Sequence, residues 1–288
     1  ILKVPEKPVC LNLGCGSTYH SKWRNLDIDP IDKNIEHWDA KNGIPAMNNS
    51  VDIVYHSHLL EHLQPEHGEA FINECFRILK PMGILRVVVP DLEQICKEYL
   101  NALERVDQNI ELAIYDAHWM RLELFDQMTR LSSGGEMYKN LLAKPPNQKF
   151  IIDRCGEQVR PLLESENKKQ NHSLKAERLP LHLNLKNLLR KLTNFSTIKD
   201  VISRIFLGNS DYKALEYGRF FLCGEIHKHM YDRISLEELI VKIGFNNVMV
   251  QSHSSSLFPN WSNYCLDSTD NGYPKKPDSL YMEAIKSK

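Results

Sequence analysis

Short runs of mainly apolar residues, bounded by turn formers, recur through the first third of the chain. They are residues 9–14, 23–29, 50–57 and 84–90. Because their apolar character is continuous rather than alternating, they are typical of parallel strands covered on both faces. Between the last two runs, apolar side chains recur at helical spacing from Pro65 to Leu79, and Pro81 and Gly83 follow. This pattern predicts a helix that crosses over between two parallel strands.

Strand and helix patterns return near the end of the chain. Residues 235–245 predict an amphipathic helix with Ser235 as its N-cap and Gly244 as its stop. Two further strands are expected at 246–252 and 279–286. The sequence therefore predicts a sheet built from both ends of the chain.

The middle of the chain has a different character. We expect residues 1–100 and 225–288 to form one α/β domain, and residues 101–224 to form a mainly helical insertion. Within it, the segment 174–195 combines a stripe of leucines with basic neighbours. Such a stripe packs on its own core, on a second copy of the chain as a homodimer contact, or on a membrane surface.

Composition narrows the kinds of partner. With 42% hydrophobic and 25% charged residues the chain is typical of a globular protein, and it has no apolar run long enough to span a bilayer. Its net charge of -1 provides no overall field that would attract nucleic acid or anionic lipid. The seven cysteines contain no Cys-x-x-Cys pair, which disfavours a zinc framework and favours a cytoplasmic location. A small molecule is the expected partner.

A glycine turn follows the first predicted strand. Gly14 and Gly16 allow the backbone to pass close beneath a ligand and to present its amides. The next strand begins only about ten residues later, which is shorter than the full helix of a dinucleotide-binding βαβ unit. Tyr19 also occupies the place of the third glycine in that fingerprint. The turn therefore disfavours a dinucleotide.

Polar side chains stand at the ends of the following strands. Asp27 ends the second strand, Asp39 a short third strand, and His56 with Ser57 the fourth. Because the carboxyl ends of parallel strands share one edge of a sheet, these groups are expected to line a ligand site. For each acid taken singly, a turn or helix cap is the alternative role.

Taken together, these segments resemble a known family. The stretches "LNLGCG", "NLDIDP", "WDAKNGIPAMNNSVDIVYHSHLLEHL" and "ECFRILKPMGILRVVVPDLE" are similar to successive motifs of class I S-adenosylmethionine-dependent methyltransferases. They resemble more narrowly a bacterial branch associated with surface-polysaccharide and secondary-metabolite pathways. The resemblance covers about residues 9–96 and 225–287. It implies a Rossmann-like sheet of seven mostly parallel strands with an antiparallel last strand.

The resemblance also implies cofactor contacts. The implied contacts are Gly14, Cys15 and Gly16 under the methionine part, Asp27 at the ribose, Ile28 at the adenine ring, Asp39 and Ala40 at the adenine amino group, and His56 and Ser57 near the sulfonium. Asn12 departs from the pattern, because many relatives have an acid there. S-adenosylmethionine has no phosphate, so it tolerates the short connection after the glycine turn better than NAD does.

Candidates for chemistry follow the fourth and fifth strands. An alcohol acceptor must lose a proton during methyl transfer, and His58, His62 and Asp91 are the candidate catalytic residues. Asp91 also fits a helix N-cap. Glu61 and His62 resemble a pair that holds a divalent metal in a few relatives. The alternative is that the pair orients its loop, and no metal is assigned.

The insertion and the segment after it supply candidate acceptor contacts. These are Gln127, Arg130, His227, Tyr231 and Asp232. His227 and His229 form a His-x-His pair, but a metal site would need a further ligand.

The sequence thus predicts an S-adenosylmethionine-dependent methyltransferase that methylates oxygen of a sugar or another small metabolite. Nitrogen and carbon acceptors remain open. The alternatives are a cofactor-binding module without turnover, an NAD-linked oxidoreductase and a nucleic-acid methyltransferase. The missing glycine counts against the oxidoreductase, and the charge balance counts against nucleic acid.

Overall fold

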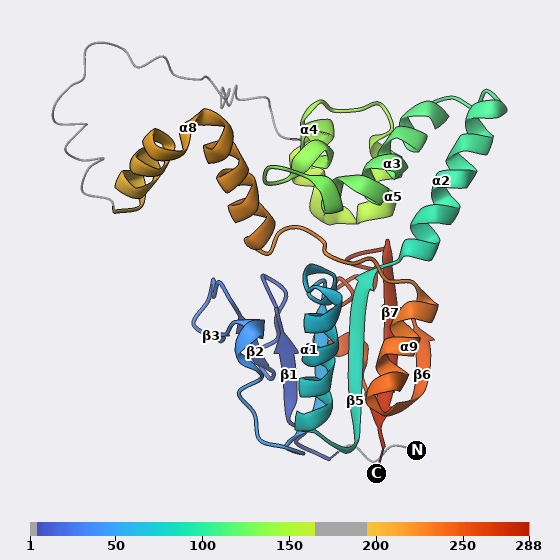
Figure 1. Ribbon diagram of the computed structural model, residues 1–288. Helices are drawn as coiled ribbons and strands as arrows, with labels where there is room; N and C mark the ends of the chain where they lie inside the picture. The colour runs from blue at the N-terminus through green and yellow to red at the C-terminus, as the bar shows by residue number, and fades with distance from the viewer. Residues whose placement is uncertain (1–4, 165–194, 288) are drawn as a thin grey trace.

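The computed structural model describes residues 5–164 and 195–287 (Figure 1). The leucine stripe at 174–195 lies outside the described residues, apart from the backbone of its last residue. In the described ranges no helix is long and apolar enough to cross a membrane.

A seven-stranded sheet forms the centre of the molecule. Its strands are β1 Cys10–Leu13, β2 Arg24–Asp27, β3 Ile35–His37, β4 Val51–Ser57, β5 Leu79–Pro90, β6 Phe245–Gln251 and β7 Ser279–Lys286. They lie in the order β3-β2-β1-β4-β5-β7-β6. The first five pair in parallel, whereas β7 runs antiparallel to both of its neighbours. The predicted fold, with its antiparallel last strand, is confirmed.

Two helices cover one face of this sheet (Figure 1). They are α1 Pro65–Ile78 and α9 Arg233–Ile243, and their apolar sides join the main core of the sheet. The helix α9 begins two residues earlier than predicted, because Asp232 is its N-cap and accepts from the amide of Ser235 at 2.8 Å. Ser235 completes a capping box from the third helical position instead. The predicted stop at Gly244 is confirmed, with φ of 112°.

The opposite face is covered by loops rather than by a helix next to β1. The structure describes all of residues 14–23, and they form turns, so the helix expected to be short after the glycine turn is absent. The long connection between β6 and β7 takes its place. Its Phe258 and Trp261 pack with Trp23 and Tyr55 in an aromatic cluster.

A buried ion network ties this connection to β5. The fully buried guanidinium of Arg86 donates to Asp267 at 2.7 Å and to Glu283 at 2.8 Å. It also donates to two backbone carbonyls and lies over the ring of Trp261. Asp267 accepts in addition from the hydroxyl of Tyr55. We call Arg86, Asp267 and Glu283 the arginine network.

The described parts of the chain between β5 and α9, residues 91–164 and 195–232, are mainly helical, as expected. Its helices are α2 Leu92–Asp107, α3 Ala113–Thr129, α4 Gly135–Leu142, α5 Gln148–Cys155, α6 Arg160–Glu164 and α8 Phe195–Leu222, which is kinked at Gly208. The helices from α2 to α6 enclose a separate small core around Trp119 and Met120. They stand beyond the carboxyl edge of the sheet (Figure 1). The expected domain boundary at residue 100 falls inside α2, which leads out of the sheet.

Candidate functional site

A pocket of about 600 Å³ opens at the carboxyl edge of the sheet. This volume lies in the range of small-molecule sites. Its lining includes Gly14, Cys15, Gly16, Ser57 and His58, together with Glu157, Gln158, Asp267, Lys276 and Tyr281. The pocket therefore combines the ends of β1 and β4 with the insertion and the connection between β6 and β7.

The glycine turn forms one wall of this pocket. Gly14 has φ of 62°, and a Cβ there would lie 3.1 Å from the side chain of Leu59. Gly16 has φ of 51° with open space where its side chain would be. The prediction that these amides face a ligand is wrong for the turn itself, since Gly14 and Cys15 donate to the carbonyl of Leu26. The turn can therefore act as a close-fitting floor rather than as an anion nest.

Asp27 joins the end of β2 to the glycine turn. Its Oδ2 accepts from the amide of Gly16 at 2.7 Å, and its Oδ1 accepts from the amide of Asp29 at 2.9 Å. Each carboxylate oxygen has a second lone pair, so the group keeps acceptor capacity for hydroxyls. Ile28 follows with 62% of its surface exposed. An exposed apolar side chain beside an acid suits contact with a flat ring.

The structure separates the remaining expected cofactor residues. Asp39 caps a short 3-10 helix that begins at Ala40, and it lines a second, more open pocket of about 570 Å³ with Trp38. His56 points away from the first pocket into the core, where its ring packs on Phe71. Burial lowers the pKa of His56 to about 4. Of the pair expected near the sulfonium, Ser57 lines the first pocket and His56 does not.

His58 is the pocket residue with the most unusual backbone. It follows β4 with φ of 52°, a conformation that non-glycine residues adopt seldom and often at functional sites. Its Nε2 lies 2.9 Å from the hydroxyl of Ser279, and its Nδ1 lies 3.2 Å from Oε1 of Glu61. The ring thus connects the pocket to a buried carboxylate.

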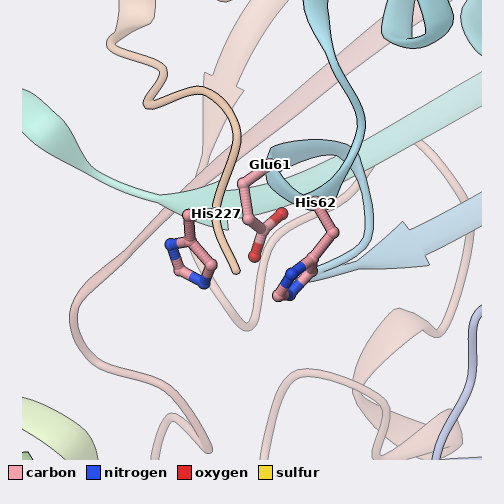
Figure 2. Close-up of side chains that lie close together, drawn as sticks. All are labelled: Glu61, His62 and His227. Atoms are coloured by element: carbon pink, nitrogen blue, oxygen red, sulfur yellow. The ribbon is translucent and has the colours of Figure 1, made fainter. Parts of the chain in front are cut away.

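Three side chains from two segments of the chain converge on one another (Figure 2). A ligand atom of each of Glu61, His62 and His227 lies within 4.8 Å of the others. Glu61 and His62 belong to the 3-10 helix Leu60–His62 after β4, and His227 belongs to the segment that leads into α9. We call these three residues the Glu61 cluster. It contains both members of the acid–histidine pair, Glu61 and His62, but only His227 of the His-x-His pair, whereas His229 packs on Tyr231.

The electrostatics of the cluster favour a carboxylate beside neutral imidazoles. Burial opposes ionisation of Glu61, but the surrounding imidazoles, that of His58 first, outweigh it and lower its pKa to about 2. Burial lowers the pKa of His227 to about 3 and also lowers that of His62. Both histidines are therefore neutral near pH 7.

Asp91 serves as a helix cap. It precedes α2 and accepts from the amide of Gln94 at 3.1 Å, and burial raises its pKa. Its amide donates to Asp278, and its neighbour Leu92 donates to the carbonyl of Tyr231. The side chain of Tyr231 is buried in the main core. Asp91 thus has the structural role that the sequence left open, and a role in chemistry stays a prediction.

The expected acceptor residues have structural partners too. Arg130 pairs with Asp126 at 3.2 Å and with Glu225 at 3.2 Å, which fixes the end of α3 against the segment before α9. The carbonyl of Gln127 accepts from the amide of His227 at 3.0 Å. Asp232, as the N-cap of α9, uses its carboxylate inside the capping box. These contacts hold the insertion onto the core, and acceptor binding by these residues stays a prediction.

Several pocket residues carry no signal in the local sequence. Glu157 and Gln158 come from the insertion, and Asp267, Lys276 and Tyr281 come from the connection before β7 and from β7 itself. Burial lowers the pKa of Lys276. The run "YPKKPD" reads as an ordinary turn-rich loop, so only its contacts in space bring it to the pocket.

A comparison with known protein families matches the part of the chain that contains the glycine turn. Residues 11–87 match a family model described as a methyltransferase domain. The matched stretch runs from β1 into β5 and includes Asp27, Glu61 and His62, but it leaves out the insertion and the last two strands. No curated protein matches the chain.

Solved structures whose backbones are similar to that of this chain include proteins from archaea and bacteria. A putative methyltransferase in complex with the Haloferax volcanii Trm112 methyltransferase activator is 10% identical, with 100% of this chain and 86% of that chain covered and a TM-score of 0.39. An S-adenosylmethionine-dependent methyltransferase from Archaeoglobus fulgidus is 11% identical, with coverages of 98% and 87% and a TM-score of 0.37. The YcgJ protein of Bacillus subtilis is 9% identical, with coverages of 99% and 94% and a TM-score of 0.38. At these scores the fold assignment rests on the strand order alone.

Proposed function

We propose that this protein is a class I S-adenosylmethionine-dependent methyltransferase that acts on a hydroxyl oxygen of a sugar or another small metabolite. The observation that carries the proposal is the hydrogen bond between Asp27 and the amide of Gly16 at the carboxyl edge of the parallel sheet. It joins the ribose-type carboxylate directly to the glycine turn, which lines the pocket, whereas Asp27 itself is not among the lining residues. The methyltransferase-domain match over residues 11–87 supports the same cofactor.

The reaction would be an in-line displacement at the methyl carbon. The acceptor oxygen forms a bond to that carbon while the carbon–sulfur bond breaks, and its electron pair stays on sulfur in S-adenosylhomocysteine. The acceptor proton passes to a base. His58 is well placed for this role, because it lines the pocket and its other ring nitrogen faces Glu61.

The insertion supports a small acceptor. Glu157 and Gln158 contribute polar side chains to the same pocket as the glycine turn. Lys276 adds a basic group from the other side, where Asp267 is already paired with Arg86 and Tyr55. A pocket with several donors and acceptors suits a hydroxyl-rich substrate, and the resemblance to the saccharide-modifying bacterial branch points to the same class.

The cofactor assignment is tested at Asp27. We expect Asp27→Ala to weaken S-adenosylmethionine binding by about 1–3 kcal/mol, the usual effect of losing a buried hydrogen-bond acceptor. Asp29→Ala is the matched control, since Asp29 is exposed and its amide only donates to Asp27. Calorimetric titration measures both. Equal affinity in the two variants would contradict the ribose assignment.

The base is tested by two conservative variants. Asparagine can replace aspartate as an N-cap, so Asp91→Asn should keep α2 intact. If Asp91 only caps α2 and His58 is the base, Asp91→Asn keeps its turnover. His58→Asn then loses turnover, and its affinity for the cofactor stays nearly unchanged. Product formation over a panel of sugar acceptors measures both. Loss of turnover in Asp91→Asn with turnover kept in His58→Asn would assign the role of base to Asp91.

A further inference from the structure

We propose that Glu61, His62 and His227 form a binding site for one divalent transition-metal ion, with Zn²⁺ the best fit to the donor set. Figure 2 shows the carboxylate of Glu61 between the two imidazole rings, with all three side chains directed into the same space. The site lies where the loop after β4 meets the segment that leads into α9.

The donor set has the chemistry of such a site. One carboxylate and two imidazoles are typical ligands of catalytic zinc, and they leave at least one coordination position open. Magnesium prefers oxygen ligands and is disfavoured here. Ligands of tetrahedral zinc stand about 2.0–2.2 Å from the ion, hence roughly 3.3–3.5 Å from one another. The atoms of the cluster, within 4.8 Å of one another, would need to approach by up to about 1.4 Å.

The side chains of the cluster lack other partners. Glu61 is fully buried, and within the described ranges neither of its carboxylate oxygens has a hydrogen-bond partner. The same holds for Nδ1 of His62 and Nδ1 of His227 among these residues. Nδ1 of His58 lies 3.2 Å from Oε1 of Glu61, so it is a close electrostatic neighbour of this carboxylate. A buried carboxylate whose oxygens accept no hydrogen bond within the described residues keeps its lone pairs for a bound cation.

The backbone holds the ligands in place before any ion binds. The carbonyl of Glu61 accepts from the amides of Lys228 at 2.7 Å and His229 at 3.2 Å. The amide of His227 donates in turn to the carbonyl of Gln127 in α3. These bonds tie the segment after the insertion to the loop after β4. The rings of His62 and His227 stand edge to face, with centroids 4.7 Å apart.

Two cations face the cluster, and they set a limit on its affinity. Arg130 lies near His227 but is paired with Asp126 and Glu225. Lys276 lies near Glu61 and lines the pocket. Its positive charge opposes the ion, so we expect binding in the micromolar range rather than that of a closed structural zinc site.

A metal at this position would act on the acceptor. None of the three ligands lines the pocket, but His58 touches Glu61 and lines it, so this ring would link the ion to the acceptor side. A hydroxyl bound to the ion would lose its proton more easily, because a divalent cation lowers the pKa of its oxygen ligands. This role rests on the proposed function, whereas binding of the ion does not.

The test uses the whole chain, stripped of metal with chelator and titrated calorimetrically with Zn²⁺ and, separately, Mg²⁺. We expect one Zn²⁺ per chain and no heat from Mg²⁺. Glu61→Gln and His227→Ala should each weaken Zn²⁺ binding at least about 100-fold, since loss of even an outer partner costs about 10–100-fold. His229→Ala is the control, because its ring lies outside the cluster, and it should bind as the wild type does.

Circular dichroism of each variant shows whether it is folded. Substitution of Co²⁺ provides a second readout, since its visible absorption bands should appear in the wild type and be lost in folded Glu61→Gln. No Zn²⁺ binding by the folded wild type, or equal binding by Glu61→Gln, would overturn the site. S-adenosylmethionine titrated into the same metal-stripped protein tests the proposed function separately.

Discussion

Two buried charged clusters flank the pocket, and their hydrogen bonding differs. In the arginine network, Arg86 donates to Asp267, Glu283 and two backbone carbonyls, and Asp267 receives a further bond from Tyr55. In the Glu61 cluster, no hydrogen bond to either oxygen of the Glu61 carboxylate is found among the described residues. All three carboxylates are buried, yet among the described residues hydrogen bonds reach only those of Asp267 and Glu283.

This difference separates a structural cluster from a ligand site. A buried ion network whose donors and acceptors are all paired holds its segments together, and it has nothing left to bind. A buried carboxylate among unpaired imidazole nitrogens retains its capacity for a ligand. The arginine network therefore fixes the connection before β7 as a pocket wall, and the Glu61 cluster is the proposed ligand site.

The largest expected effect comes from breaking the arginine network. Arg86→Met leaves two buried carboxylates without their cation, so we expect the free energy of unfolding to fall by about 3–5 kcal/mol. Lys80→Met is the matched control on the same strand, because the Lys80–Asp52 pair is partly exposed and should contribute less than about 1 kcal/mol. Urea denaturation measures both. A loss below 1 kcal/mol for Arg86→Met would make the network dispensable.

His56 is a third buried polar group, and like Glu61 it lacks hydrogen-bond partners among the described residues. Both ring nitrogens lack partners in the part of the chain that the structure describes, and burial lowers the pKa of His56 to about 4. Because the folded state resists protonation, stability present above pH 6.5 should be lost as the pH falls through 4. The difference between the ordinary histidine pKa of 6.5 and the pKa of about 4 of buried His56 corresponds to about 3 kcal/mol.

The contribution of His56 is isolated by comparison with His56→Leu. Lowering the pH from 7 to 4 should reduce the unfolding free energy of the wild type by about 3 kcal/mol more than that of His56→Leu. Chemical denaturation at several pH values measures it. If the difference in unfolding free energy between the two proteins does not depend on pH, the ring of His56 has a hydrogen-bond partner in solution.

The smallest expected effect concerns metal-linked stability of the Glu61 cluster. At a free Zn²⁺ concentration 100 times the dissociation constant, linkage adds about 2.7 kcal/mol to the unfolding free energy. Folded Glu61→Gln should gain little, and Arg86→Met should gain as much as the wild type. Thermal unfolding with and without Zn²⁺ measures these gains. An equal gain in Glu61→Gln would place the ion elsewhere.

The sequence was sufficient for the elements of the sheet. β1, β4 and most of β5 are buried on both faces, so their apolar runs are continuous and easy to recognise, whereas in β3 only Ile35 is buried. Gly244 marked a helix end because its positive φ requires glycine. The N-cap of α9 was missed since Asp232 and Ser235 both belong to one capping box, and either could start the helix.

The site could be predicted only where it depends on neighbours in sequence. Gly14, Gly16 and Asp27 follow adjacent parallel strands, so their meeting at one edge follows from the fold. The contact of Glu61 and His62 with His227 crosses the whole insertion, and no local pattern indicates it. The pairing of Arg86 with Asp267 spans 181 residues and depends on packing of the connection before β7.

The most direct test of the proposed function is calorimetric titration of the purified chain with S-adenosylmethionine, S-adenosylhomocysteine and NAD in parallel. Our account predicts micromolar binding of both sulfur compounds and no binding of NAD. Binding of NAD alone, or of none of the three by a folded chain, would contradict it.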